Sequence, residues 1–328
     1  MALENELNIA LEAVRAAGML TNDIQDRIGA DDVVSKDDRS PVTIADFGSQ
    51  AVIVHHLNKA FPNDAIVGEE DDQAVSEDED LRQRILTYTR AHSPVASDED
   101  LLYHIGLGSG AVNVAERYWT VDPIDGTKGF LRGDHYAVAL ALIEQGEVVL
   151  GVLGCPTLQV DMKIPNGEKG CLFYGVKNKG TYVRSFSDAA DRSVTVDQIQ
   201  DASQAVLCES VESGHVSHTF HDQVLKRLGI TAQPFRIDSQ CKYAAVARGL
   251  ASIYLRRSSS KGYREKIWDH AAGCMVVSEA GGRVTDFQGD ALDFSGETTL
   301  PDRNGIVVTN GHIHDEVVAA IQQTLSAM

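Results

Sequence analysis

The stretch Trp119-Thr-Val-Asp-Pro-Ile-Asp-Gly-Thr-Lys-Gly-Phe-Leu-Arg-Gly133 is the most informative part of the sequence. In it, an apolar run precedes two carboxylates, Asp122 and Asp125. Pro123 fixes its own φ angle and stiffens the turn, and Gly126 lets the backbone bend so that the next amides point outward. Two acids on one rigid turn beside exposed N–H groups suit divalent metals that hold a phosphate. The alternative is a solvated Asx-turn, the ordinary fate of an Asp-Pro…Asp-Gly segment.

Three further blocks each present an acid at the edge of an expected element. Ser-Pro-Val-Thr-Ile-Ala-Asp46 leads into a helical pattern and puts Asp46 in the first turn, where a carboxylate is favourable. In Ala-Ile-Val-Gly-Glu69 a short strand ends and Glu69 emerges at its tip. In Ile-Trp-Asp-His-Ala-Ala-Gly273, Asp269 stands at the start of another helix. Taken alone, Asp46 is better explained as a helix N-terminal acid. We interpret His270 as structural, because Asp-His adjacency alone is not metal-ligand spacing.

The four blocks together resemble the lithium-sensitive, magnesium-dependent phosphatases of the inositol monophosphatase superfamily. The fuller motif, with Lys128-Gly-Phe-Leu-Arg132, looks most like the 3′(2′),5′-bisphosphate nucleotidases within it. The blocks match in the same order along the chain, and the resemblance covers nearly all of it. It implies an α/β fold, a layered α/β/α/β/α sandwich, with the site between two lobes.

The resemblance also implies a metal centre and a base. Five groups would bind two or three magnesium ions: the carboxylates of Glu69, Asp122, Asp125 and Asp269 and the carbonyl of Ile124. Asp46 and Thr127 would together activate the attacking water. Magnesium prefers a few carboxylates and keeps water and substrate phosphate in its remaining positions. Because a metal lowers the pKa of its bound water, Asp46 acting through Thr127 would accept a proton that is already acidic.

The charge of the chain is strongly negative, with a formal net value of −19. Such a charge argues against nucleic-acid binding through phosphate neutralisation. A phosphorylated substrate would be repelled too, unless basic residues gather where it docks. They gather between Lys242 and Lys266, where seven of the 29 Lys and Arg residues accompany a single acid, Glu265. For the later part of this segment, a basic surface loop without a role is the alternative.

The resemblance gives part of this basic segment a function. Ser239, Lys242 and Arg256 match positions that bind the second phosphate and the sugar of a nucleotide. A Lys and an Arg suit a dianionic phosphate that is held rather than cleaved. The other substrate-binding residues that the resemblance implies are Gly126, Thr127, His215 and Asp269.

Composition and segment patterns predict where the protein acts. The five cysteines form no C-x-x-C pair, as in reduced proteins of the cytoplasm. No run approaches the ~20 apolar residues of a membrane span, and Glu4, Glu6 and Glu12 interrupt any signal-peptide core. We therefore expect a cytoplasmic monomer without membrane or nucleic-acid partners.

The pattern of elements predicts two lobes, an α+β lobe at 1–190 and an α/β lobe at 191–328. The first would carry most metal ligands, and the second would carry the docking residues and Asp269. The acidic stretch 71–100 reads as a solvated or mobile, partly helical connection. Expected elements of the first lobe are helices near 4–29 and 45–60, a strand at 65–67, and hairpins at 136–143/148–153 and 171–176/180–184. Expected elements of the second lobe are 205–208, 217–228, 240–250, 253–256, 269–280, 306–309 and 313–325.

These observations predict an enzyme that removes the 3′-phosphate of adenosine 3′,5′-bisphosphate, giving AMP and phosphate. The sulfated relative, 3′-phosphoadenylyl sulfate, is a candidate second substrate. One alternative is a phosphatase of inositol phosphates. Another is a catalytically silent nucleotide sensor, although such a protein should have lost one of the acids or Thr127, and all are present.

Overall fold

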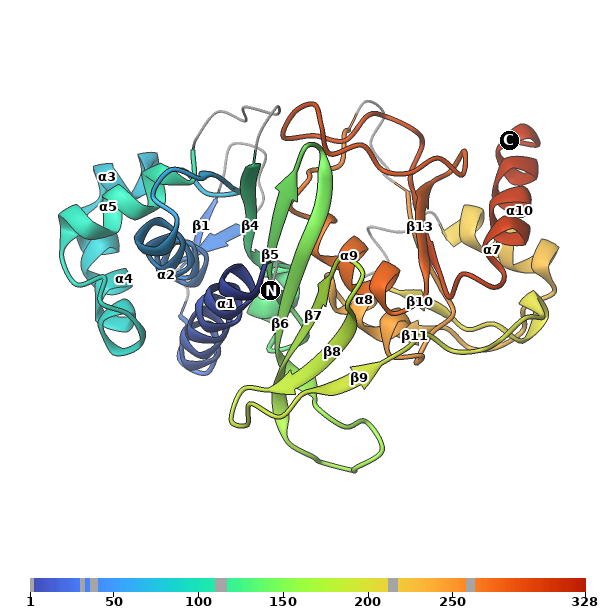
Figure 1. Cartoon of the computed structure of the whole chain (residues 1–328), viewed down its shortest axis with the longest axis horizontal. Coiled ribbons are helices and arrows are strands. Elements are labelled where there is room, and N and C mark those ends of the chain that lie inside the picture. The colour runs from blue at the N-terminus through green and yellow to red at the C-terminus, as the bar shows by residue number, and fades with distance from the viewer. Residues whose placement is uncertain (1–2, 30–32, 36–40, 110–116, 212–217, 258–262) are drawn as a thin grey trace.

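The protein forms five layers in which helices and two β-sheets alternate (Figure 1). This arrangement confirms the predicted α/β/α/β/α sandwich. The computed structural model describes residues 3–29, 33–35, 41–109, 117–211, 218–257 and 263–328.

Two long helices, α1 (Glu4–Gln25) and α2 (Ile44–Ala60), make the first layer. They pack against each other and against the neighbouring sheet, α1 on its central strands and α2 beside the strand that carries the acidic motif. Helix α2 begins with a capping box, in which Thr43 and Asp46 satisfy each other's backbone donors. Just ahead of it, β1 (Val33–Ser35) and β2 (Pro41–Thr43) form a short antiparallel pair. Asp46 is therefore anchored at the start of a buried helix.

The second layer is a seven-stranded sheet whose strands follow one another in sequence order. Its first two strands pair in parallel, and every later pair is antiparallel, including both predicted hairpins. Its strands are β3 (Ala65–Gly68), β4 (Arg117–Asp125), β5 (Ala137–Glu144), β6 (Glu147–Gln159), β7 (Lys169–Val176), β8 (Gly180–Ser185) and β9 (Arg192–Val194).

The acidic motif is the end of strand β4, whereas the sequence predicted a rigid turn after an apolar run. The β4–β5 register shifts between Asp122 and Asp125, where Pro123 has no N–H to give to the ladder. The bulge aims both acids at the same edge of the sheet. A short helix, α6 (Thr127–Leu131), follows at once.

The acidic stretch after Glu69 is helical over most of its length, which agrees with the partly helical connection that the sequence predicted, and residues 76–80 of its acidic run are exposed. It forms α3 (Gln73–Glu77), α4 (Glu79–His92) and α5 (Asp98–Leu107). Asp78 and Ser97 cap α4 and α5 through their side chains, so part of the acidic character belongs to helix starts. Both helices pack against α2.

The remaining layers are a helix pair between the sheets, a five-stranded sheet, and an outer helix pair (Figure 1). An apolar core is continuous from the first sheet through the middle helices to the second sheet. The lobe boundary near residue 190 stays a prediction. The middle helices are α8 (Cys241–Ala247) and α9 (Ala271–Glu279), and the outer helices are α7 (His218–Leu228) and α10 (His314–Ser326). The strands are β10 (Leu207–Glu209), β11 (Phe235–Arg236), β12 (Ile253–Arg256), β13 (Arg283–Asp286) and β14 (Ile306–Thr309), in the order β11-β10-β12-β14-β13.

Within the described ranges, none of the helices combines the length and the apolar character that crossing a membrane requires. All five cysteines are buried and outside disulfides.

Candidate active site

Four acids meet at the edge of the first sheet. Strands β3 and β4 are parallel neighbours, and Gly68 pairs with Val121, so Glu69, just after β3, lies next to Asp122 in β4. Asp125 follows the bulge at the end of β4, and Asp269 reaches the same region from the segment that precedes α9. The sequence placed these acids in three separate blocks, and the fold brings them together.

Burial and mutual repulsion both disfavour the charged forms of Asp122 and Asp269 in this acid cluster. Burial, followed by the charges of Glu69, Asp125 and Asp269, holds the pKa of Asp122 well above its usual range. Burial, Asp125 and Glu69 likewise raise the pKa of Asp269, despite the opposing charge of Arg256. Asp122 is 1% exposed, and its Oδ1 has no hydrogen-bond partner among the described residues. A buried unpaired oxygen among several carboxylates fits a hard divalent cation, which would balance this charge.

Asp46 and Thr127 lie together beside this cluster, as the sequence predicted. Asp46 Oδ2 accepts hydrogen bonds from the backbone N–H of Thr43 at 2.8 Å and from its hydroxyl at 2.7 Å. The other oxygen, Oδ1, lies 3.5 Å from the Thr127 hydroxyl, which also lies 3.4 Å from the carbonyl oxygen of Ile124. The carboxylate is thus held from one side and faces the threonine with the other.

A close backbone contact joins the acidic motif to the second half of the chain. Gly126 has a φ angle of +93°, and a Cβ atom there would lie 2.9 Å from the Cβ of Ser239. Ser239 is itself left-handed, with a φ angle of 63°. The next residue, Gln240, donates its backbone N–H to Asp125 Oδ2 at 2.6 Å. The contact therefore holds the segment that precedes α8 against Asp125 of the acid cluster.

A cavity of about 220 Å³ opens on the acid cluster and has a basic side. Glu69, Asp125 and Asp269 line it together with Lys242 and Arg256. A larger hollow of about 370 Å³ is bordered by Glu265 but by none of these acids, so it is not the place where the predicted residues meet.

Lys242 is buried at the basic side of this cavity. Its Nζ donates to the Ser210 hydroxyl at 3.2 Å and lies 5.2 Å from the centre of the Tyr254 ring. Burial lowers the pKa of Lys242, and the nearby charge of Asp125 opposes this effect. A buried cation near the acids and open to the cavity suits an anionic group of the ligand.

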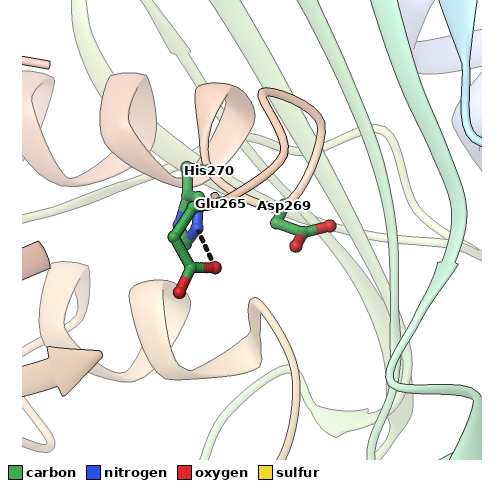
Figure 2. Close-up of side chains that lie close together, drawn as sticks. All are labelled: Glu265, Asp269 and His270. Carbon is green, nitrogen blue, oxygen red and sulfur yellow. Dashed lines mark hydrogen bonds and ion pairs between the residues drawn. The ribbon is translucent and has the colours of Figure 1, made fainter. Parts of the chain in front are cut away.

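Arg256, also predicted to bind substrate, is held by a neighbouring acid. Its Nε donates to Glu265 Oε1 and Oε2 at 3.1 and 3.2 Å. Burial alone would raise the pKa of Glu265, but hydrogen bonds and charge from His270 and Arg256 lower it to about 2. In Figure 2 the Glu265 carboxylate faces His270, while Asp269 points away from this pair. No sequence pattern indicated the Arg256–Glu265 pair, because β12 and the next segment bring the two residues together.

The cavity also includes residues to which sequence reasoning gave no role. Arg132 donates to Asp238 Oδ2 at 2.5 Å, and Asp238 also accepts from the backbone N–H of Val211 at 2.9 Å. Arg132 ends the motif quoted above, so its place in that run was the signal that could have identified it. The other unassigned lining residues are Lys128, Gly129, Ser210, Gln240, Tyr254 and His270. His215, predicted near the adenosine, lies outside the described residues.

The chain matches known proteins over its full length. Residues 2–326 match the inositol monophosphatase family. A 3′(2′),5′-bisphosphate nucleotidase of Emericella nidulans is 42% identical, with 99% of each chain covered. One of Dictyostelium discoideum is 39% identical, covering 97% of this chain and 96% of its own.

Solved structures agree on the fold. An inositol monophosphatase of Thermotoga maritima superposes with a TM-score of 0.68 at 23% identity, covering 98% of each chain. The inositol monophosphatase of Anabaena superposes with a TM-score of 0.66 at 22% identity, covering 100% of each chain. These matches confirm the resemblance drawn from the sequence motifs, and the chain belongs to the inositol monophosphatase family.

Proposed function

We propose that this protein is a magnesium-dependent phosphatase that removes the 3′-phosphate of adenosine 3′,5′-bisphosphate, with 3′-phosphoadenylyl sulfate as a second substrate. The observation that carries the proposal is a single cavity lined by three acids of the cluster, Glu69, Asp125 and Asp269, and by two cations, the buried Lys242 and the partly buried Arg256. A substrate with two phosphates can use both sides at once. The names of the relatives point to the same substrate.

Glu69, Asp122, Asp125 and Asp269, with the carbonyl oxygen of Ile124, are the groups that would hold two or three magnesium ions. Bound magnesium would supply charge stabilisation for the transferred phosphoryl group and would acidify an attacking water. The orphaned Oδ1 of Asp122 and the raised pKa values of Asp122 and Asp269 support this assignment. The Gln240 N–H keeps the Asp125 carboxylate oriented.

Asp46 and Thr127 would accept the proton that the attacking water loses. Because Thr43 occupies Oδ2 of Asp46, the second oxygen is directed at the Thr127 hydroxyl. The threonine can donate its proton to Asp46 while a lone pair accepts from water. The 3.5 Å separation leaves room to shorten when substrate binds, as is common for catalytic hydrogen bonds in free enzymes.

Lys242 and Arg256 would bind the 5′-phosphate, which stays on the product, and Ser239, Gly126 and His215 would contact the nucleotide. Charge-assisted hydrogen bonds from a Lys and an Arg are strong and specific for such a group. This division of labour separates the proposed substrate from inositol monophosphates, which lack a second phosphate.

The test is phosphate release with magnesium from adenosine 3′,5′-bisphosphate and from inositol 1-phosphate, measured side by side, with and without lithium. The proposal predicts faster, lithium-sensitive release from the nucleotide. Preference for the inositol ester would keep the acid cluster and remove the nucleotide assignment. Release from neither would favour a silent nucleotide-binding protein.

A further inference from the structure

Glu265 connects Arg256 to a buried network beside the proposed site. Both of its oxygens accept from Arg256 Nε, and Oε2 also lies 3.3 Å from His270 Nε2. Glu265 is 9% exposed. Glu265, Asp269 and His270 are close enough to suggest one metal site, but two side chains already engage Glu265, and Asp269 points elsewhere (Figure 2). The geometry indicates a support for Arg256.

The network continues inward to Tyr243. His270 Nδ1 lies 2.8 Å from the Tyr243 hydroxyl, and both residues are buried. Since a carboxylate only accepts, Nε2 carries the proton toward Glu265, and in the neutral ring Nδ1 accepts from the tyrosine. A Cβ atom at Gly273 would lie 2.4 Å from the Tyr243 ring, so helix α9 packs tightly on it. Tyr243 is thus a rigid end of the chain Tyr243–His270–Glu265–Arg256.

The network restrains the Nε edge of the Arg256 guanidinium, so the two terminal nitrogens can bind a ligand in the cavity. Glu265 engages Nε, and the two terminal nitrogens donate to no other group in the described ranges. Arg256 lines the cavity with Lys242. A guanidinium held by its Nε edge has a fixed plane, and binding a phosphate through the terminal N–H groups then costs little further ordering.

We propose that Glu265 is a positioning residue that holds Arg256 in place for the phosphate that is bound but not cleaved, and that His270 and Tyr243 hold Glu265 in turn. This inference rests on the proposed function in assigning Arg256 to that phosphate. Glu265 itself does not line the cavity, so it would act on the phosphate only through Arg256.

The test measures binding of AMP, which carries only the retained phosphate, by calorimetry in the presence of magnesium. Glu265→Ala should weaken binding about tenfold, as expected when one ordered side chain is released. Glu265→Asp should weaken AMP binding by a similar factor, because its shorter side chain keeps the charge but cannot reach Arg256. Glu265→Gln should bind more tightly than either, since its amide oxygen can still accept from Nε.

Two controls separate positioning from general damage. Glu297→Ala removes the exposed partner of Arg264, 2.9 Å away, outside this cavity, and should leave AMP binding unchanged. Adding Glu265→Ala to Arg256→Ala should weaken binding no further than Arg256→Ala does alone, because the two residues act as a unit. In turnover, Glu265→Asp should raise KM for the bisphosphate with little change in kcat, and should leave adenosine 3′-monophosphate unaffected.

Several results would overturn the inference: AMP binding by Glu265→Asp equal to wild type, losses that add in the double variant, or equal KM changes for both substrates. Absence of AMP binding to the wild-type protein would overturn it too. Glu265-dependent AMP binding without hydrolysis of the bisphosphate would sink the proposed function and leave the inference standing. If the wild-type protein hydrolyses the bisphosphate and the Glu265 variants bind AMP as tightly as wild type, the inference fails and the proposed function stands.

Discussion

Replacing Gly126 with alanine should damage both stability and catalysis, because the glycine serves two purposes. Its φ angle of +93° strains any L-residue, by about 1–2 kcal/mol. The new Cβ would also lie 2.9 Å from the Ser239 Cβ, and overpacking of this kind costs about 1–3 kcal/mol. Together, the free energy of unfolding should fall by about 2–5 kcal/mol.

Gly133→Ala provides the matched control, since Gly133 has a φ angle of +74° and a Cβ atom added there would have no neighbour within 4 Å. The free energy of unfolding of this variant should fall only by the backbone strain, about 1–2 kcal/mol. Equilibrium urea unfolding of both variants measures the difference. Gly126→Ala should also push Ser239 away, which weakens the 2.6 Å bond from the Gln240 N–H to Asp125. Phosphate release at increasing magnesium should then show a higher magnesium requirement for this variant alone.

Equal losses of stability in the two variants would show that the contact with Ser239 carries no strain. An unchanged magnesium requirement in Gly126→Ala would show that the contact does not position Asp125. Either outcome would refute the view that this backbone junction assembles the site.

Three further variants test individual parts of the site. Thr127→Val keeps the shape and removes the hydroxyl, so kcat should fall by roughly 10²–10⁴-fold with little change in melting temperature; turnover near wild type would remove Thr127 from the proton path. Lys242→Met should raise KM for the bisphosphate about 10–100-fold, and more than for adenosine 3′-monophosphate; equal changes would contradict its assignment to the retained phosphate. Asp122→Asn should abolish magnesium-dependent turnover. Because the folded-state pKa of Asp122 is raised, metal-free protein should lose stability as pH rises from about 4 through that raised value, and the variant should show a flatter profile in urea unfolding.

Much of this structure follows from local patterns in the sequence. Apolar periodicity predicted α1 and α2, and alternating apolar runs with short polar links predicted the β5–β6 and β7–β8 hairpins, because both signals come from neighbouring residues. The acidic motif was predicted as the centre of the site and as a rigid turn. The structure instead makes it the end of a strand, because the β4 ladder that carries Asp122 depends on distant partners in β3 and β5.

Local sequence patterns could not predict the features that depend on tertiary contacts. The acidic stretch was predicted as a solvated or mobile, partly helical connection; its acids at 77–80 are exposed, but Leu81 and Ile85 stand four residues apart and bury one face of α4. Asp122 is buried, which its place in a polar Asp-Pro-Ile-Asp-Gly segment did not indicate. The supports of the basic side, Glu265 for Arg256 and Ser210 for Lys242, come from segments whose meeting no spacing rule indicates.

The most direct test of the central claim is to follow adenosine 3′,5′-bisphosphate with magnesium by phosphorus NMR and identify the products. If the acid cluster cleaves one phosphate while Lys242 and Arg256 hold the other, the products are AMP and inorganic phosphate, and the 5′-phosphate resonance persists. Formation of adenosine 3′-monophosphate, or an unchanged spectrum, would contradict the account.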